Sequence, residues 1–167
     1  MPFTVPGARH PALVCGYRTR TDFAAHAGLG RVLGVPIASV ELVDDRDYHF
    51  DLVSCPLDSR RALVAPVGLD RYGTHVRHRV VDELVVLTGD EASMFCANAI
   101  VVGSTIVMRA RTVRLGRLLE GFGFTVAVSG VGEFLKAGRR RRCLMLALDA
   151  RSRRSLSTPA LDARLSS

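Results

Sequence analysis

A chain of 167 residues with 48% hydrophobic and 23% charged residues is long enough to bury a core of its own and has ordinary globular composition. The formal net charge is +7, but Lys136 is the only lysine among 23 basic residues. Such an arginine bias argues more for coding composition than for a nucleic-acid partner. No run approaches the ~18 apolar residues of a membrane span, and the N-terminal residues lack the apolar region of a signal peptide. We therefore expect a cytoplasmic protein with neither a membrane nor a nucleic-acid partner.

Apolar spacing and turn residues predict a chain in which strands and helices alternate. The predicted strands are 12–17, 35–43, 49–53, 62–67, 83–88, 99–102, 105–108, 124–129 and 144–148. The predicted helices are 23–33, which Asp22 caps and Gly34 ends, 69–80, and 113–119. A break is expected at Gly89 and a two-residue hairpin turn at Gly103. The pattern indicates an α/β domain over 1–150, in about three loosely similar units, and a disordered basic tail over 151–167.

Two residues at opposite ends of this domain have the chemistry of a covalent active site. Cys143 follows a basic loop and precedes an apolar strand, and the arginines beside it favour its thiolate. A thiolate attacks an electrophilic carbon, and a nearby histidine such as His49 can protonate the leaving group and then activate water. Asp51 follows His49 by two residues, so on a strand both point to one face, where a carboxylate can hold a guanidinium.

Each of these residues has a simpler interpretation when it is considered alone. A single histidine on a strand is more often a surface residue, and a single cysteine before a leucine-rich strand is more often a small core residue. The other three cysteines are most simply core thiols in a reducing compartment, because their spacing fits neither a disulfide framework nor a zinc site: Cys15, Cys55 and Cys96. We therefore expect no metal and no cofactor.

Four segments, in the right order over residues 16–148, resemble those of one enzyme family. They are Gly16–Asp22 with the following Ala24–His26; Val35–Asp44 with Tyr48–Asp51 and Pro56–Asp58; Ala97–Ala99; and Glu133–Gly138 with Arg142–Leu144. Together the segments are similar to those of the pentein superfamily, in its dimethylarginine dimethylaminohydrolase and amidinotransferase branch.

The resemblance implies an α/β propeller of which this chain would form about three of five strand-helix modules. It implies that Cys143 is the nucleophile, that His49 is the general acid and base, and that Asp51 and Arg20 bind the substrate. The implied reaction is cleavage of a C–N bond in an arginine-type guanidinium through a covalent cysteine intermediate, without a cofactor. The implied partner is a small guanidine substrate.

The chain also departs from the family pattern. The N-terminal modules, which carry acidic residues that hold the guanidinium, have no counterpart, and the stretch 3–8 contains no acid. Arginines at 139–141 replace the glycines that precede the family nucleophile. A partial propeller would need a second copy or the missing modules on another chain to cover its open faces. Two alternatives to an active enzyme therefore stay open, an inactive remnant that serves as a binding module and a basic interaction domain.

Overall fold

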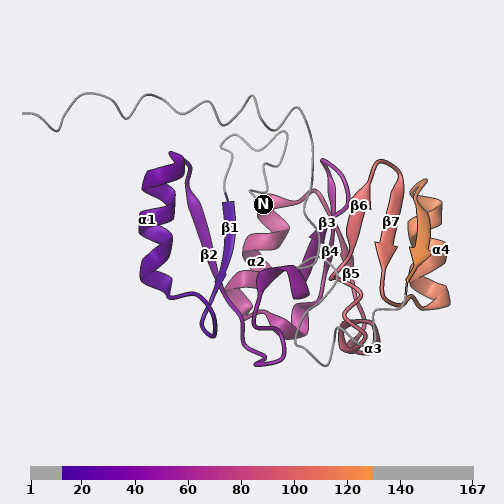
Figure 1. The fold of residues 1–167 in the computed structure, drawn as a ribbon, viewed down its shortest axis with the longest axis horizontal. Coiled ribbons are helices and arrows are strands. Elements are labelled where there is room, and N and C mark those ends of the chain that lie inside the picture. Colours follow the sequence, from indigo (N-terminus) through magenta and orange to yellow (C-terminus); the bar gives the residue numbers. More distant parts are fainter. Residues whose placement is uncertain (1–12, 130–167) are drawn as a thin grey trace, which may run out of the picture.

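Residues 13–129, the part of the chain that the computed structural model describes, form three small sheets that follow one another along the chain. Figure 1 shows the sheets side by side, with the first helix at one end of the molecule and the last helix at the other. Each sheet contains one parallel pair of strands joined by a helix, as parallel neighbours require. The predicted alternation of strands and helices is therefore confirmed for this part of the chain.

The first unit has two parallel strands and one helix. Its elements are β1 (Leu13–Tyr17), α1 (Phe23–Leu33) and β2 (Ile37–Glu41). The Asp22 side chain caps α1 by accepting a hydrogen bond of 2.8 Å from the Ala24 amide. Gly34 ends the helix in the left-handed conformation with φ 64°, which glycine adopts without strain. Both predicted limits of this helix are confirmed.

The second unit adds an antiparallel strand to the parallel pair. Its elements are β3 (Ser54–Pro56), β4 (Arg61–Val64), the 3₁₀ turn η2 (Pro66–Gly68), α2 (Arg71–Val80) and β5 (Glu83–Val86). The strand predicted over 62–67 ends early, because Pro66 has no amide hydrogen for the ladder and its fixed φ suits the start of a helical turn.

The third unit has the same arrangement. Its elements are β6 (Ile100–Val102), β7 (Thr105–Met108), α4 (Val113–Gly121) and β8 (Thr125–Val128). The hairpin between β6 and β7 turns at Gly103, whose φ is 58°. The predicted two-residue turn is confirmed, because this turn type needs a residue that tolerates positive φ.

The strand predicted over 49–53 is wrong. Phe50–Leu52 form a 3₁₀ turn, η1, in which the Leu52 amide donates to the His49 carbonyl oxygen at 3.0 Å. Leu52 is 2% exposed and Val53 is fully buried. The Val53 amide donates to the Phe50 carbonyl oxygen at 3.2 Å, so the segment closes on itself instead of pairing as a strand. The expectation that His49 and Asp51 share a strand face therefore fails.

A helix also stands where a break was predicted. The short helix α3 spans Gly89–Ser93. The Thr88 hydroxyl accepts from the Glu91 amide, and the Glu91 carboxylate accepts from the Thr88 amide at 2.9 Å. This reciprocal capping box satisfies amides that the start of a helix leaves unpaired, and it overrides the weak helix propensity of glycine.

The core runs through all three units. The large side chains that are fully buried include Leu52, Leu63, Ile106, Met108, Leu115 and Leu119. The structure does not describe 1–12 and 130–167, so Cys143, the strand predicted over 144–148 and the tail over 151–167 lie outside it. Among the described helices, none has the length and apolar character needed to cross a membrane.

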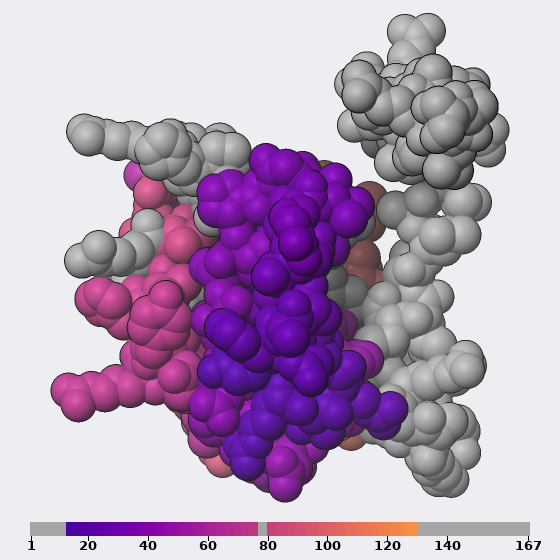
Figure 2. Space-filling view, turned by 90° about the vertical axis from the view of Figure 1, so that its left-hand side faces the viewer, coloured from indigo at the N-terminus to yellow at the C-terminus, as the bar shows by residue number. Residues whose placement is uncertain are grey.

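Helix α1 forms one end of the molecule, and Figure 2 shows this end as the indigo surface. The helix buries only one of its residues, His26, while Phe23 is 60% exposed, Leu33 48% and Val32 83%. Polar residues normally cover the outer face of a surface helix, so this end presents an apolar face.

Candidate active site

A cleft of about 880 Å³ separates the first unit from the start of the second. One wall consists of β1 residues and of α1 residues such as His26 and Leu29. The opposite wall is the segment from Tyr48 to Asp51, together with residues of β3. Two of the predicted site residues, His49 and Asp51, therefore line one cavity, although the strand on which the prediction relied is absent.

His49 is the residue that precedes η1, and its side chain is exposed. The backbone at His49 is extended, with φ −132° and ψ 146°, so the chain enters the turn from the charged loop before it. The ring lies edge-on to Tyr48, with 5.0 Å between the two centroids. The imidazole is exposed at the edge of the cleft, where it can exchange protons with water.

Asp51 is held by a residue from a distant part of the sequence. The Asn98 side-chain amide donates to Asp51 Oδ2 at 2.9 Å and approaches the Asp51 carbonyl oxygen at 3.4 Å. Asn98 is 3% exposed, so little solvent competes for the bond. Asn98 thereby fixes the orientation of a carboxylate that faces the cleft.

The backbone before Asn98 explains how it reaches this position. Phe95 has φ 56°, a left-handed conformation that is uncommon for a residue other than glycine. Its amide donates to the Ala92 carbonyl oxygen at 2.8 Å, and its carbonyl oxygen accepts from the Asn98 amide at 3.0 Å. These bonds fold the segment after α3 into a compact turn. The sequence did not predict the contact between Asn98 and Asp51, and the only pointer was the place of Asn98 in a segment that resembles the family.

Arg20 lies in the exposed turn between β1 and α1. Its guanidinium carbon is 5.3 Å from the centroid of the Tyr48 ring, within the range of a cation–π contact. Tyr48 in turn contacts the His49 ring, so the structure brings Arg20 to the side of the cleft where His49 lies.

His26 lines the cleft, although the sequence pattern indicated no role for this residue. It is 4% exposed, and its Nδ1 is 2.7 Å from the Ser39 hydroxyl oxygen on β2. The ring also packs edge-on against Tyr17, while Nε2 is buried and has no partner among the described residues. The side chain holds α1 against the sheet and forms part of the cleft wall.

The three described cysteines have thiols that are poor nucleophiles. Burial raises the pKa of Cys96 to about 11, and burial also raises the pKa of Cys15. Cys55 is 1% exposed, and its thiol donates to the Ala99 carbonyl oxygen at 3.3 Å. A thiol with a raised pKa has little thiolate at neutral pH, so Cys15 and Cys96 lack the reactivity of a nucleophile, and burial keeps the Cys55 thiol away from a substrate. The prediction of core thiols is confirmed for Cys55 and Cys96, whereas Cys15 is half-buried and lines the cleft.

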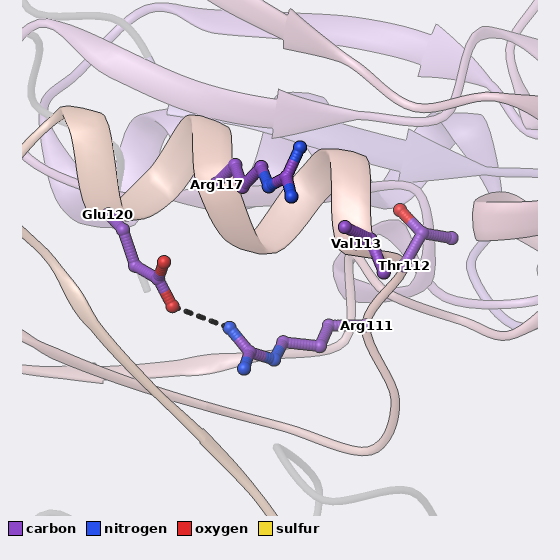
Figure 3. A pocket seen from close by; sticks show the side chains of 5 residues that line it. All are labelled: Arg111, Thr112, Val113, Arg117 and Glu120. Carbon is purple, nitrogen blue, oxygen red and sulfur yellow. Dashed lines mark hydrogen bonds and ion pairs between the residues drawn. The ribbon is translucent and has the colours of Figure 1, made fainter.

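A second hollow, of about 240 Å³, lies at the start of α4, far along the chain from His49. Figure 3 shows Arg111 reaching across it to Glu120, with Arg117 on the helix beside them. The Arg111–Glu120 ion pair is 2.6 Å long and half exposed. The two charges neutralise each other, and none of the five lining residues is a cysteine or a histidine, so the hollow does not have the chemistry of the expected reaction.

Two curated relatives connect the chain to enzymes that act on arginine. The bifunctional arginine dihydrolase/ornithine cyclodeaminase AgrE of Nostoc sp. is 33% identical over 136 residues, which cover 80% of this chain and 19% of the relative. N(G),N(G)-dimethylarginine dimethylaminohydrolase of Mycobacterium tuberculosis is 30% identical over 134 residues, which cover 80% of this chain and 44% of the relative. No family model matches the chain.

Solved structures give the same result for the fold. The N-terminal domain of ArgZ, a cyanobacterial arginine dihydrolase bound to its product, superimposes with a TM-score of 0.75 at 31% identity, over 80% of this chain and 50% of that chain. The Pseudomonas aeruginosa dimethylarginine dimethylaminohydrolase, complexed with citrulline, has a TM-score of 0.61 at 18% identity, over 75% of this chain and 47% of that one, and supports the fold alone.

The described residues form an α/β structure with mixed sheets, and this fold matches that of an arginine dihydrolase. The homologues are enzymes of the pentein superfamily. The expected α/β fold is therefore confirmed, whereas the number of propeller modules stays a prediction. The chain spans 19% to 50% of the length of these relatives.

Proposed function

We propose that this chain forms the cysteine and histidine side of a guanidine-modifying hydrolase that cleaves a C–N bond of an arginine-type guanidinium. The observation that carries the proposal is the cleft lined by His49 and Asp51, in a fold that matches an arginine dihydrolase at 31% identity. Asp51 is oriented by Asn98 and offers an acceptor to the cationic substrate. Arg20 supplies a cation on the same side for a substrate carboxylate.

In the proposed mechanism the Cys143 thiolate attacks the guanidinium carbon, and a carbon–sulfur bond forms. His49 protonates the departing amine as the carbon–nitrogen bond breaks, which leaves a thiouronium adduct. His49 then accepts a proton from water while the water oxygen attacks the same carbon. Cleavage of the carbon–sulfur bond releases a ureido product and restores the thiolate. The supporting observation for Cys143 as nucleophile is that the thiols of Cys15 and Cys96 have raised pKa values.

The finer features of the proposal concern how the site is completed. We infer that the described units are about three of the five modules of a propeller, since they align with half of the ArgZ domain. The remaining modules, on the same polypeptide, on another chain or on a second copy, would cover the apolar face of α1, where Val32 is 83% exposed. We further propose that the protein is cytoplasmic and needs no cofactor.

The experiment that tests this function measures ureido-product formation from arginine, methylated arginines and agmatine, with Cys143→Ser as the control. Turnover by the wild type that the substitution abolishes supports the proposal. Intact-mass measurement on substrate should also detect an adduct of the substrate amidine carbon on Cys143. Turnover that survives in Cys143→Ser would refute the mechanism, and no turnover by folded protein on any of these substrates would favour the inactive remnant.

A further inference from the structure

Arg18 has a backbone conformation that residues with a side chain rarely adopt. It is the first residue after β1, and its φ is 125°. Its amide donates to the Thr21 carbonyl oxygen at 3.0 Å, which closes the turn that also carries Arg20. Glycine would adopt this φ without strain, so an arginine at this position needs side-chain contacts to offset the strain.

The side chain of Arg18 makes such contacts. Its guanidinium Nη1 donates to the Val43 carbonyl oxygen at 3.0 Å and to the Leu42 carbonyl oxygen at 3.3 Å. These carbonyls directly follow β2, where the chain leaves the sheet and enters the loop over residues 43–49. Arg18 therefore anchors the first end of the loop that leads to His49.

The same turn also reaches the second end of that loop. The Arg20 guanidinium lies over Tyr48 at 5.3 Å, and the Tyr48 ring is in edge contact with the His49 ring at 5.0 Å. The two arginines, Arg18 and Arg20, thus hold opposite ends of one loop, and His49 follows the second anchored end.

The side of the loop that faces Gly68 and Leu69, its inner side, is anchored by contacts that do not involve Arg18. The Val43 amide donates to the Gly68 carbonyl oxygen at 3.1 Å, and Leu42 forms a β-bridge with Leu69. Asp47 is 7% exposed and lies so close to Gly68 that a Cβ there would be 2.5 Å from the Asp47 carboxylate. Removal of the Arg18 side chain would therefore free the Leu42 and Val43 carbonyls, while the contacts with Gly68 and Leu69 stay in place.

We propose that Arg18 is a positioning residue, which fixes the loop over residues 43–49 and thereby the orientation of the His49 ring at the cleft. The catalytic meaning of this role rests on the function proposed above, but the positioning itself does not. Arg18 acts through the Leu42 and Val43 carbonyls and through the turn that it shares with Arg20, without touching the substrate.

Arg18→Gly separates this role from a merely structural one. Glycine relieves the backbone strain, so without a positioning role the variant should be at least as well ordered as the wild type. Arg60→Gly is the matched control, because Arg60 is another exposed turn arginine, with a 3.5 Å contact to Asp82. Arg18→Lys keeps the charge and one donor and should restore part of the wild-type behaviour.

The first readout is the NMR signal of the His49 ring, assigned by its loss in His49→Gln, together with amide hydrogen exchange. In Arg18→Gly we expect the His49 signal to shift or broaden, because the ring moves relative to Tyr48. The Leu42 amide, which donates to the Tyr17 carbonyl oxygen next to Arg18, should exchange at least about tenfold faster, while the Val43 amide on Gly68 and the amides of β4 and β5 stay unchanged. An unchanged His49 signal and unchanged exchange in Arg18→Gly would overturn the proposal, and so would equal changes in Arg60→Gly.

Where turnover is measurable, kcat of Arg18→Gly should fall about tenfold while KM stays within about twofold of the wild-type value. Arg20→Gln, in contrast, should raise KM, because Arg20 is proposed to bind substrate. A rise in KM with unchanged kcat in Arg18→Gly would place Arg18 at the substrate and refute a positioning role. If no guanidine is turned over, the proposed function fails, while the NMR and exchange measurements still decide the role of Arg18.

Discussion

The substitution Glu91→Gln tests how the second and third units are held together. Glu91 is fully buried on α3, and its carboxylate accepts hydrogen bonds from the Thr88 amide at 2.9 Å and from the Thr112 hydroxyl. Arg114 on α4 forms an ion pair with the same carboxylate through its Nη2 and donates through Nε at 3.2 Å. One side chain thus caps α3 and fastens it to the start of α4.

The expected loss of stability follows from the protonation of Glu91. Burial raises the pKa of this carboxyl, but the hydrogen bonds from Arg114, Thr112 and Thr88 outweigh it and lower the pKa from 4.5 to about 2. A depression of that size is equivalent to about 3 kcal/mol of folding free energy. Because the Arg114 side chain is 47% exposed, solvent screening reduces the expected loss in Glu91→Gln to about 2 kcal/mol at pH 7.

Urea unfolding of the wild type and Glu91→Gln, followed by circular dichroism over pH 3–7, measures this difference. A depressed carboxyl pKa gives stability that is complete above about pH 4.5 and is lost as the pH falls towards 2, so less than half of the difference should remain at pH 3. Glu120→Gln is the matched control: it breaks the half-exposed ion pair with Arg111 in Figure 3 and should lose less than about 1 kcal/mol. Equal losses in the two variants, or a loss in Glu91→Gln that does not change with pH, would refute the reasoning.

Two further predictions concern packing and thiol reactivity. Gly68→Ala should destabilise the protein by about 1–3 kcal/mol in thermal unfolding, because the new Cβ would lie 2.5 Å from Asp47 Oδ2. Gly28→Ala, in the interior of α1 with open space around the new Cβ, should be neutral or stabilising by up to about 1 kcal/mol, and equal effects of the two substitutions would contradict the packing argument. Iodoacetamide at pH 7 should modify Cys143 at least tenfold faster than Cys96, whose pKa is raised to about 11, as followed by peptide mass spectrometry. Faster labelling of Cys96 would argue against Cys143 as the activated thiol.

The parts of the fold that sequence patterns predicted are those fixed by local signals. The first helix has an aspartate cap and a left-handed glycine at its two ends, Asp22 and Gly34, and both act within a few residues. The hairpin turn at Gly103 is equally local. The break predicted at Gly89 was wrong despite a local signal, the capping box of Thr88 and Glu91, whereas the turn after His49 has no such local signal. Phe50–Leu52, predicted as part of a strand, form a 3₁₀ turn that is followed by Val53, a buried member of the core shared by the units.

At the candidate site, residue types could be predicted from the sequence but the contacts between distant residues could not. The roles proposed for His49 and Asp51 come from residue type and from the family resemblance, and the structure shows that both residues line one cleft. The side chains that contact Asp51 and the His49 loop could not be inferred, because they lie far from these residues in the sequence. Asn98 reaches Asp51 across 47 residues of sequence, through a left-handed Phe95 that no propensity predicts. Periodicity in a single sequence predicts contacts within a helix or strand, and it does not predict a contact between residues this far apart.

The clearest case is Arg18, where local and tertiary preferences oppose each other. Its φ of 125° is unfavourable for any residue with a Cβ, so a purely local prediction would place glycine there. The arginine is compatible with the fold because its guanidinium reaches the Leu42 and Val43 carbonyls at the far end of β2. Local strain that distant hydrogen bonds offset is expected where a protein needs one particular arrangement, and here that arrangement leads directly to His49.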